Sequence, residues 1–430
     1  MESLITWCCA LLLLLLFIKI PVFVALLSAS ALYFFIDSDV LPSLFIQRLI
    51  SGTQNLALLA IPFFVCAGIF MNYTGVTRRI MVFCEALIGG MRGAIGQVTI
   101  LLATLMGGLS GSGLADAAME AKMLSPELQK RGFSNAFSSV LVATAAIITP
   151  LIPPGIAMII YGTVANLSIG KLFVAGIGPG LMLCVMLMLY VAVFSYSHAN
   201  TIKKSDEPFS LKRLAVAFKG AFLPLCLPVI IIGGIRIGAF TPTEAGAIAI
   251  VYALFLGVLY HEMKLKDLVK GITETVVTSG AIMIIIAAAS AFAWIMTRER
   301  IPQQITLAFS AYLNSKIVFL LALNLFILFI GMFVEGNAAM IIIVPLIAPL
   351  AYHFGIDPIH FATIVIFNFS LGALSPPVGT LMFVTCSVTK CPIGSFIREA
   401  VPFYLILLLG LLMITFIPWI STGLVNLIYN

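Results

Sequence analysis

Apolar runs long enough to form membrane-spanning helices alternate with short polar connectors along the whole chain. A helix needs about 20 apolar residues to cross a bilayer, and the runs lack the period-2 alternation of outer-membrane barrel strands. The expected crossings are 3–18, 20–36, 55–73, 134–166, 172–197, 220–240, 243–260, 272–297, 358–389 and 400–420. The pattern therefore predicts an all-α polytopic membrane protein.

Two stretches of the chain combine short apolar limbs with a polar, glycine-rich tip. Limb 95–109 is about 22 Å long as a helix, too short for a hydrocarbon core of about 30 Å, and GGLSGSG joins it to limb 114–124. GMFVEGN joins limbs 317–330 and 338–350 in the same way. We interpret both stretches as re-entrant hairpins, and a tilted crossing with a glycine kink is the alternative.

Two of the crossings, 134–166 and 358–389, are interrupted by a proline pair. Proline lacks an amide donor and clashes with the carbonyl four residues before it, so PLIPPGIAM and ALSPPVGTL each predict a broken helix. The two pairs coincide when the chain is aligned with itself at an offset of 223 residues. The same offset aligns Gly113 with Gly336, Pro126 with Pro349, Gly132 with Gly355 and Pro179 with Pro402. This shared register predicts an internal duplication.

The second copy is predicted to be inverted relative to the first. The partner 272–297 is the fifth crossing after 55–73, and an odd step along the series of crossings reverses the orientation. When connector 198–219 is placed in the cytoplasm, 17 of the 23 Lys and Arg residues fall on that side, as the positive-inside rule requires. Both termini then lie outside. Segments 74–93 and 298–316 are amphipathic and suit helices lying along the membrane interface, or else ordinary connectors.

The half-helices at each break offer groups that can bind a cation and groups that can bind an anion. The end of the first half presents carbonyl oxygens to a cation, and the start of the second half presents amides to an anion. Paired breaks in two inverted halves are typical of a transporter's binding site, although plain proline kinks are the alternative. We predict one sodium site per half, because oxygen-only ligands suit a hard cation. The candidates are Ser110, Gly111, Ser112, Gly113, Thr149 and Pro150 in the first half, and Gly336, Asn337 and Gly372 in the second.

Few ionisable residues lie within the proposed core. Asp116 and Glu120, four residues apart, either serve the site or point to the cytoplasmic side, and Glu335 contacts substrate or ion or pairs with a basic residue. This scarcity favours sodium over proton coupling. The eight cysteines show no metal-ligand spacing, so no cofactor and no metal other than sodium is expected. The net charge of +6 does not predict a nucleic-acid partner, because basic residues in a membrane protein mainly mark the loops that face the cytoplasm.

The motifs GGLSGSGLADAAMEAKML, ITPLIPPG and LGALSPPVGT, in this order, resemble the large membrane subunit of tripartite ATP-independent periplasmic (TRAP) transporters. The resemblance implies an inverted-repeat elevator transporter in the bacterial inner membrane that imports an organic acid with sodium and without ATP. Expected partners are membrane lipid, a small four-helix membrane subunit and a periplasmic substrate-binding protein. The resemblance also implies ion binding by 372–380, which adds Ser375, Pro377 and Thr380 to the sodium candidates of the second half. It implies substrate near Ser110, Ser112, Gly155 and Glu335. From overall likeness to the sialic-acid branch of the family, sialic acid is the first substrate prediction, and a C4-dicarboxylate-like acid is the second.

The resulting domain scheme divides the chain into scaffold and transport segments. Scaffold helices are expected at 1–73 and 198–297, interfacial arms at 74–93 and 298–316, and the transport-domain repeats at 94–197 and 317–430. The main rival is a sodium–dicarboxylate symporter that works without partners. An intramembrane enzyme would need a nucleophile–base pair or metal ligands, which the sequence does not show. A channel would need a ring of charge at a constriction, which is also missing.

Overall fold

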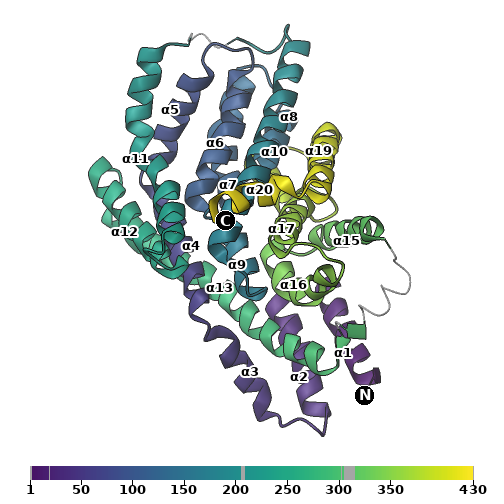
Figure 1. The fold of residues 1–430 in the computed structure, drawn as a ribbon. Helices are drawn as coiled ribbons and strands as arrows, with labels where there is room; N and C mark the ends of the chain where they lie inside the picture. The colour runs from purple at the N-terminus through teal and green to yellow at the C-terminus, as the bar shows by residue number, and fades with distance from the viewer. Residues whose placement is uncertain (1, 19, 205–208, 302, 305–314, 430) are drawn as a thin grey trace.

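The computed structural model describes residues 2–18, 20–204, 209–301, 303–304 and 315–429. The regular structure of these residues is helical, apart from one isolated bridge between Arg92 and Lys204 (Figure 1). The helices are α1 (Glu2–Phe17), α2 (Val22–Ile36), α3 (Ser43–Thr53), η1 (Leu56–Leu59), α4 (Ala60–Tyr73), α5 (Val76–Ile88), α6 (Ala94–Ser110), α7 (Gly113–Lys130), α8 (Asn135–Ala145), η2 (Thr149–Leu151), α9 (Ile156–Val164), α10 (Ile169–Ser197), α11 (Leu211–Arg236), α12 (Pro242–Tyr260), α13 (Leu265–Arg298), α15 (Lys316–Gly331), α16 (Gly336–His353), α17 (Pro358–Leu374), α18 (Thr380–Thr389), α19 (Ile393–Phe416) and α20 (Trp419–Tyr429).

The predicted polytopic all-α fold is confirmed. In the described part of the chain, seven helices are long and apolar enough to cross a membrane, and the bent pair of α8 and α9 adds an eighth. Ten crossings were expected. Three expected crossings are not of spanning length: α1 and α2 have only 16 and 15 residues, and five residues separate α17 from α18. One helix, α16, was expected as a hairpin limb and is itself of spanning length.

Several helices extend beyond the apolar runs that predicted them. α11 begins at Leu211 and α13 at Leu265, where the first turns carry charged residues and so fall outside a hydropathy run. Two helices were missed altogether. α3 is amphipathic, and α20 follows the proline at 418, so both looked like the ends of neighbouring runs.

Both hairpins and both broken helices are present. α6 and α7 pack against each other around Gly111, whose φ of +63° makes the turn, and α15 and α16 form the second pair against α17. The first pair therefore forms a hairpin, and the alternative of one kinked crossing is excluded there. In Figure 1, α6 lies in the upper part of the molecule and α16 lies below it.

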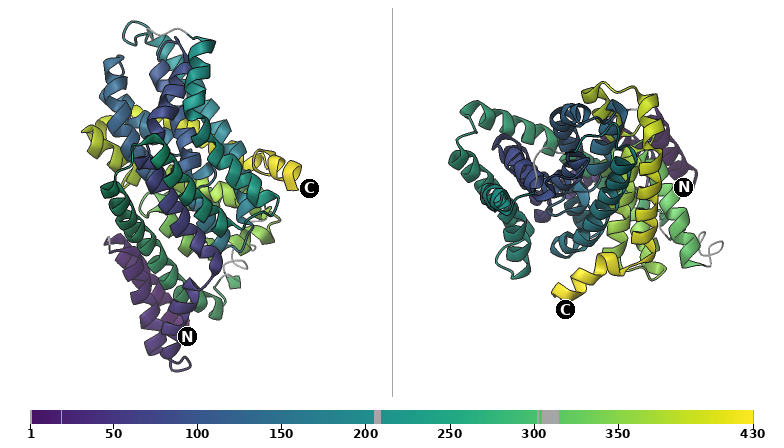
Figure 2. Two further views of the ribbon diagram at one scale, coloured as in Figure 1. Left: turned by 90° about the vertical axis from the view of Figure 1, so that its left-hand side faces the viewer. Right: turned by 90° about the horizontal axis from the view of Figure 1, so that it is seen from above.

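A scaffold of long helices packs beside these elements. α13 has 34 residues and lies against α2, α3 and α4, while α12 packs along α4 (Figure 2). Phe34 stacks on Trp294 with ring centroids 5.2 Å apart, and Arg298 pairs with Asp37 at 3.6 Å, which fixes α2 to the far end of α13.

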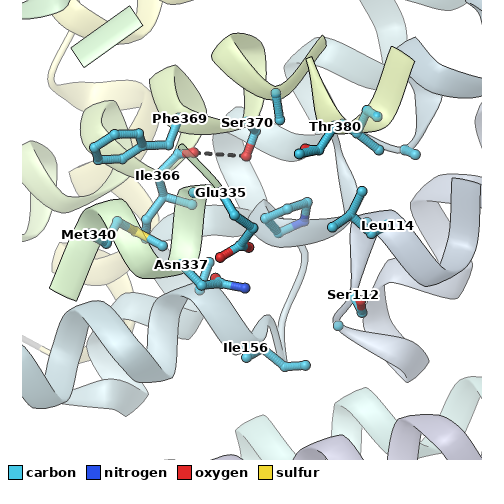
Figure 3. A pocket seen from close by; sticks show the side chains of 18 residues that line it. Ser112, Leu114, Ile156, Glu335, Asn337, Met340, Ile366, Phe369, Ser370 and Thr380 are labelled. Carbon is cyan, nitrogen blue, oxygen red and sulfur yellow. Dashed lines mark hydrogen bonds between the residues drawn. The ribbon is translucent and has the colours of Figure 1, made fainter. Parts of the chain in front are cut away.

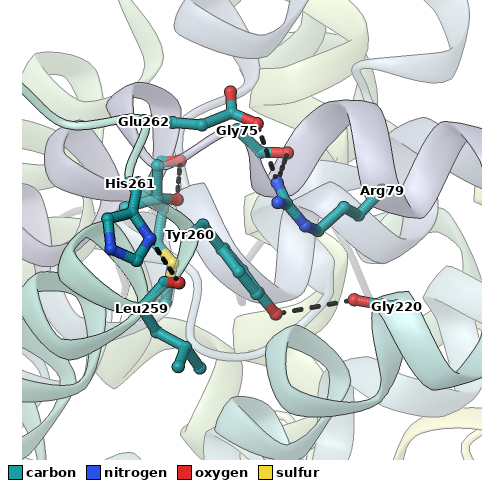
Figure 4. Close-up of polar contacts among 9 residues, drawn as sticks. Gly75, Arg79, Gly220, Leu259, Tyr260, His261 and Glu262 are labelled. Atoms are coloured by element: carbon teal, nitrogen blue, oxygen red, sulfur yellow. Dashed lines mark hydrogen bonds and ion pairs between the residues drawn. The ribbon is translucent and has the colours of Figure 1, made fainter.

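Segment 74–93, the first predicted arm, contains a separate helix, α5. Its place along the membrane interface stays a prediction. Arg79 on this helix donates to Gly75 O at 3.2 Å and to Glu262 Oε1 at 3.1 Å, and its guanidinium lies 3.6 Å from the centre of the Tyr260 ring (Figure 4). Tyr260 OH in turn reaches Gly220 O at 3.5 Å. The arm is thereby tied to α11 and α12. The second predicted arm, 298–316, lies largely outside the described residues.

Candidate functional site

The tips of both hairpins and both helix breaks meet around one cavity of about 80 Å³ (Figure 3). In this view Glu335 and Asn337 face Ser112 and Leu114 across the space. Its described lining is Gly111, Ser112, Gly113, Leu114, Ala146, Pro150, Ile156, Ala157, Glu335, Gly336, Asn337, Met340, Ile366, Phe369, Ser370, Ala373, Thr380 and Leu381.

Not every residue predicted for the site reaches this cavity. Eight of the predicted residues line it, namely Gly111, Ser112, Gly113, Pro150, Glu335, Gly336, Asn337 and Thr380. Six others do not belong to the described lining, namely Ser110, Thr149, Gly155, Gly372, Ser375 and Pro377. Sequence reasoning missed Ser370 and Met340. Both lie in apolar helix interiors, where the sequence offers no signal for them.

The first break runs from the end of η2 to the start of α9, with a cis peptide bond between Pro153 and Pro154. The helix axis turns by 44° here. Ile156 N donates to Gly111 O at 3.3 Å, which joins the second half-helix to the hairpin tip. The carbonyls of this break are only partly free, because Thr149 O accepts from Ile152 N at 3.2 Å. Pro150 O cannot receive its usual helical bond, since residue 154 is proline.

The second break repeats this arrangement. Residues 375–379 separate α17 from α18, with a cis bond between Pro376 and Pro377, and Gly379 N donates to Met332 O at 3.2 Å. At the offset of 223, Gly379 corresponds to Ile156, so both second halves bind their hairpins through the same position. Gly372 packs on Gly331 so closely that a Cβ on Gly372 would lie 2.7 Å from the Gly331 backbone.

Asp116 joins the first hairpin to the first break. Its Oδ2 accepts from Ser110 Oγ at 2.5 Å and from Thr149 Oγ1 at 3.1 Å, and the side chain is fully buried. The sequence left open whether Asp116 faces the cytoplasm or serves the site. In the structure its carboxylate bonds the hairpin tip and the first break, although it does not belong to the described lining of the cavity. Glu120, one turn further along α7, is also fully buried, and neither of its oxygens has a donor among the described residues.

The polar groups of the second hairpin are arranged differently. Glu335 is the N-cap of α16, where its Oε2 accepts from Ala338 N at 3.0 Å. Thr380 Oγ1 is buried and has no partner in the part of the chain that the structure describes. Ser375 Oγ donates to Leu371 O at 2.9 Å, which uses its proton inside α17.

Four helices begin at the cavity. The first residues of α7, α9, α16 and α18 are Gly113, Ile156, Gly336 and Thr380, and all four belong to the lining. Helix N-termini carry partial positive charge and free amides, so this arrangement attracts an anion. The described lining holds no Lys, Arg or His, and its one charged residue is Glu335. Within the described residues there is no group of three or more His, Cys, Asp or Glu side chains able to hold a metal, so the available cation ligands are oxygens.

Residues 9–420 match the family model described as the DctM component of the tripartite ATP-independent periplasmic transporter. The chain is 37% identical to the sialic acid TRAP transporter large permease protein SiaM of Vibrio cholerae, with 94% of each chain covered. It is 39% identical to the C4-dicarboxylate TRAP transporter large permease protein DctM of Pseudomonas aeruginosa, with 88% of each chain covered. The 2,3-diketo-L-gulonate TRAP transporter large permease protein YiaN of Escherichia coli is 36% identical over 91% of this chain and 92% of its own.

Among solved structures, the fold is similar to that of the YdaH transporter of Alcanivorax borkumensis. The TM-score is 0.65 at 14% identity, with 98% of each chain covered. The similarity to MtrF of Neisseria gonorrhoeae is lower, with a TM-score of 0.52 at 13% identity over 96% of this chain and 94% of the other. At these identities the likeness concerns the fold alone.

Proposed function

Since the chain belongs to the DctM family of TRAP transporter large permeases, as a multi-pass protein of the inner membrane, we propose that it imports a small organic acid together with sodium. The observation that carries this proposal is the meeting of four helix N-termini at one cavity without a basic side chain. Backbone amides and dipoles then replace the usual arginine or lysine as the attraction for a carboxylate. Relatives named for sialic acid, C4-dicarboxylates and 2,3-diketo-L-gulonate share the acidic group that this cavity suits.

Sodium coupling follows from the balance of charge at the cavity. Glu335 lies beside the place where an anionic substrate would bind, and the described lining offers no basic side chain to offset it. A cation bound near each hairpin tip supplies the missing positive charge, so an acid is held well only when sodium is bound. Hydroxyl and carbonyl oxygens of Ser110, Thr149, Pro150 and Thr380 are available as hard-cation ligands.

The cavity also bears on the mechanism. The volume of about 80 Å³ is well below the roughly 300 Å³ or more of pockets that enclose drug-sized ligands, so we expect the tips to move apart when a whole sugar acid binds. We place the moving part at the two hairpins and two broken helices, which share the cavity, and the fixed part at the scaffold of α1–α4 and α11–α13. In this elevator scheme the moving part carries substrate across the membrane, and a small four-helix membrane subunit stabilises the scaffold.

Partner dependence separates this proposal from a self-sufficient symporter. The permease is reconstituted in liposomes with the small subunit and a periplasmic binding protein, and uptake of candidate acids is followed with an inward sodium gradient. Uptake is expected only with all three proteins and sodium present. Uptake by the permease alone would support the symporter, and uptake independent of sodium would contradict the coupling.

A further inference from the structure

Asp116 connects two elements that the proposed function assigns to the first cation site. Its Oδ2 accepts one hydroxyl proton from Ser110 at the hairpin tip and another from Thr149 at the break. A hydroxyl has one proton and two lone pairs. Once both protons point to Asp116, the lone pairs of Thr149 Oγ1 are free to accept a cation. Ser110 Oγ also accepts from Ser112 N at 3.4 Å, so it keeps one lone pair for a cation.

The charge of Asp116 has no counterpart in its surroundings. The side chain is fully buried, and its Oδ1 has no hydrogen-bond partner among the described residues. The elements that pack most extensively on α7 are α6, η2, α8 and α18, and none of them carries a Lys, Arg or His within its bounds. α5 also contacts α7, through Thr77 and Met119, but of its two arginines Arg78 is exposed and Arg79 pairs with Glu262. A buried carboxylate without a positive partner is unfavourable, and Glu120 one turn away adds a second acidic group. A bound cation would supply the missing positive charge.

The second repeat lacks this arrangement. At the offset of 223, Asp116 corresponds to Ala339 and Glu120 to Ile343, while Ser110 and Thr149 correspond to Phe333 and Gly372. The tip of the second hairpin does carry Glu335, but this carboxylate caps α16 and faces the cavity. The two repeats therefore have the same backbone arrangement, but only the first has a buried carboxylate next to its proposed cation site.

We propose that Asp116 is a positioning residue that makes the two cation sites unequal: it orients the hydroxyls of Ser110 and Thr149 and supplies the charge by which the first site binds sodium more tightly than the second. This inference rests on the proposed sodium coupling. It adds an order of binding, in which the first-repeat site fills at lower sodium concentrations and prepares the cavity for the acid.

The test uses Asp116→Asn in the complete three-protein transporter, with Glu127→Gln as the matched control. Glu127 lies on the same helix, but it is solvent-accessible and pairs with Lys130 at 2.6 Å. Asp116→Asn should raise the sodium concentration for half-maximal uptake about tenfold or more, while uptake at saturating sodium falls much less. The control should stay near the wild-type value, and Asp116→Glu, which keeps the charge but lengthens a fully buried side chain, should recover only part of it. An unchanged half-saturation concentration in Asp116→Asn would overturn the proposal.

Thermal unfolding of the purified permease gives a readout that a purely structural role would not produce. In potassium medium, Asp116→Asn should be at least as stable as wild type, because the uncompensated charge is gone. In sodium medium at equal ionic strength, wild type should gain stability and Asp116→Asn should gain little. A variant that fails to fold in potassium would also contradict the proposal, since hydrogen bonding alone would then explain Asp116. Sodium-independent uptake by wild type would instead remove the proposed function itself.

Discussion

Ser112 and Glu335 occupy equivalent positions in the two repeats, 223 residues apart, and each is the N-cap residue of its hairpin's second limb. Both line the same cavity from opposite tips (Figure 3). The two caps differ in chemistry. Glu335 accepts from Ala338 N, whereas the Ser112 side chain makes no capping hydrogen bond. One repeat thus places a hydroxyl at the cavity and the other places a carboxylate.

Glu335→Gln keeps the shape of the cap and removes the negative charge. Because a carboxylate beside the cavity opposes an anionic substrate, the Michaelis constant for the acid at low sodium should fall roughly fivefold, which corresponds to about 1 kcal/mol. Uptake kinetics at two sodium concentrations measure this. The effect should shrink at saturating sodium, where the cation already offsets the charge. A higher Michaelis constant at both concentrations would show that Glu335 binds the cargo directly.

Thr380→Val tests the unpartnered hydroxyl at the second break. The substitution preserves the side-chain shape, and Thr380 Oγ1 has no partner among the described residues, so thermal stability should not fall. Sodium-driven uptake should drop several-fold if this oxygen binds a cation. Thr385→Val on the same helix is the matched control, because its hydroxyl already donates to Leu381 O at 2.9 Å. Equal uptake in the two variants would remove Thr380 from the site.

Arg79→Ala tests the anchoring of the arm helix. The change removes the pair with Glu262 and the stacking on Tyr260 (Figure 4), and the free energy of unfolding should fall by about 1–2 kcal/mol. Arg79→Lys should recover only part of this, because lysine cannot bond as a planar fork or stack as well. Arg78→Ala, on the exposed side of the same helix, is the control and should leave stability nearly unchanged.

The stability of the arm should also depend on pH through Glu85. Burial raises the pKa of this half-buried carboxyl, although Arg213 and Arg131 oppose the shift. A raised folded-state pKa means that the stability from the neutral form is complete below the ordinary pKa of about 4.5 and is lost as pH rises through the raised value. Glu85→Gln stays neutral, so its melting temperature should match wild type near pH 4 and exceed it near pH 8. A constant difference across this range would show that the charge of Glu85 is not involved.

Sequence alone predicted the interrupted and re-entrant elements because proline pairs and glycine-rich tips act locally. Proline at 154 and 377 has no amide to donate whatever surrounds it, so the breaks follow from covalent structure. The helix ends were less accessible. The charged first turns of α11 and α13 continue the helix outside the apolar runs, where hydropathy carries no signal.

The side-chain arrangement of the site depended on tertiary packing and was predicted only in part. The sequence identified the hairpin tips, and it could not choose between two orientations for Asp116. That choice depends on Thr149, which lies 33 residues further along the chain and reaches Asp116 only through the packing of η2 on α7. Ser370 is similar. Its hydroxyl bonds Ile366 O within α17, and only the fold brings it to the cavity (Figure 3).

The most direct test of sodium-coupled acid binding at this cavity is a density map of the complete transporter with an organic acid, in sodium medium and in potassium medium. The account predicts density for the acid's carboxylate between the N-termini of α7, α9, α16 and α18 in sodium, and its loss in potassium. Acid bound elsewhere in the permease, or bound equally well in both media, would contradict it.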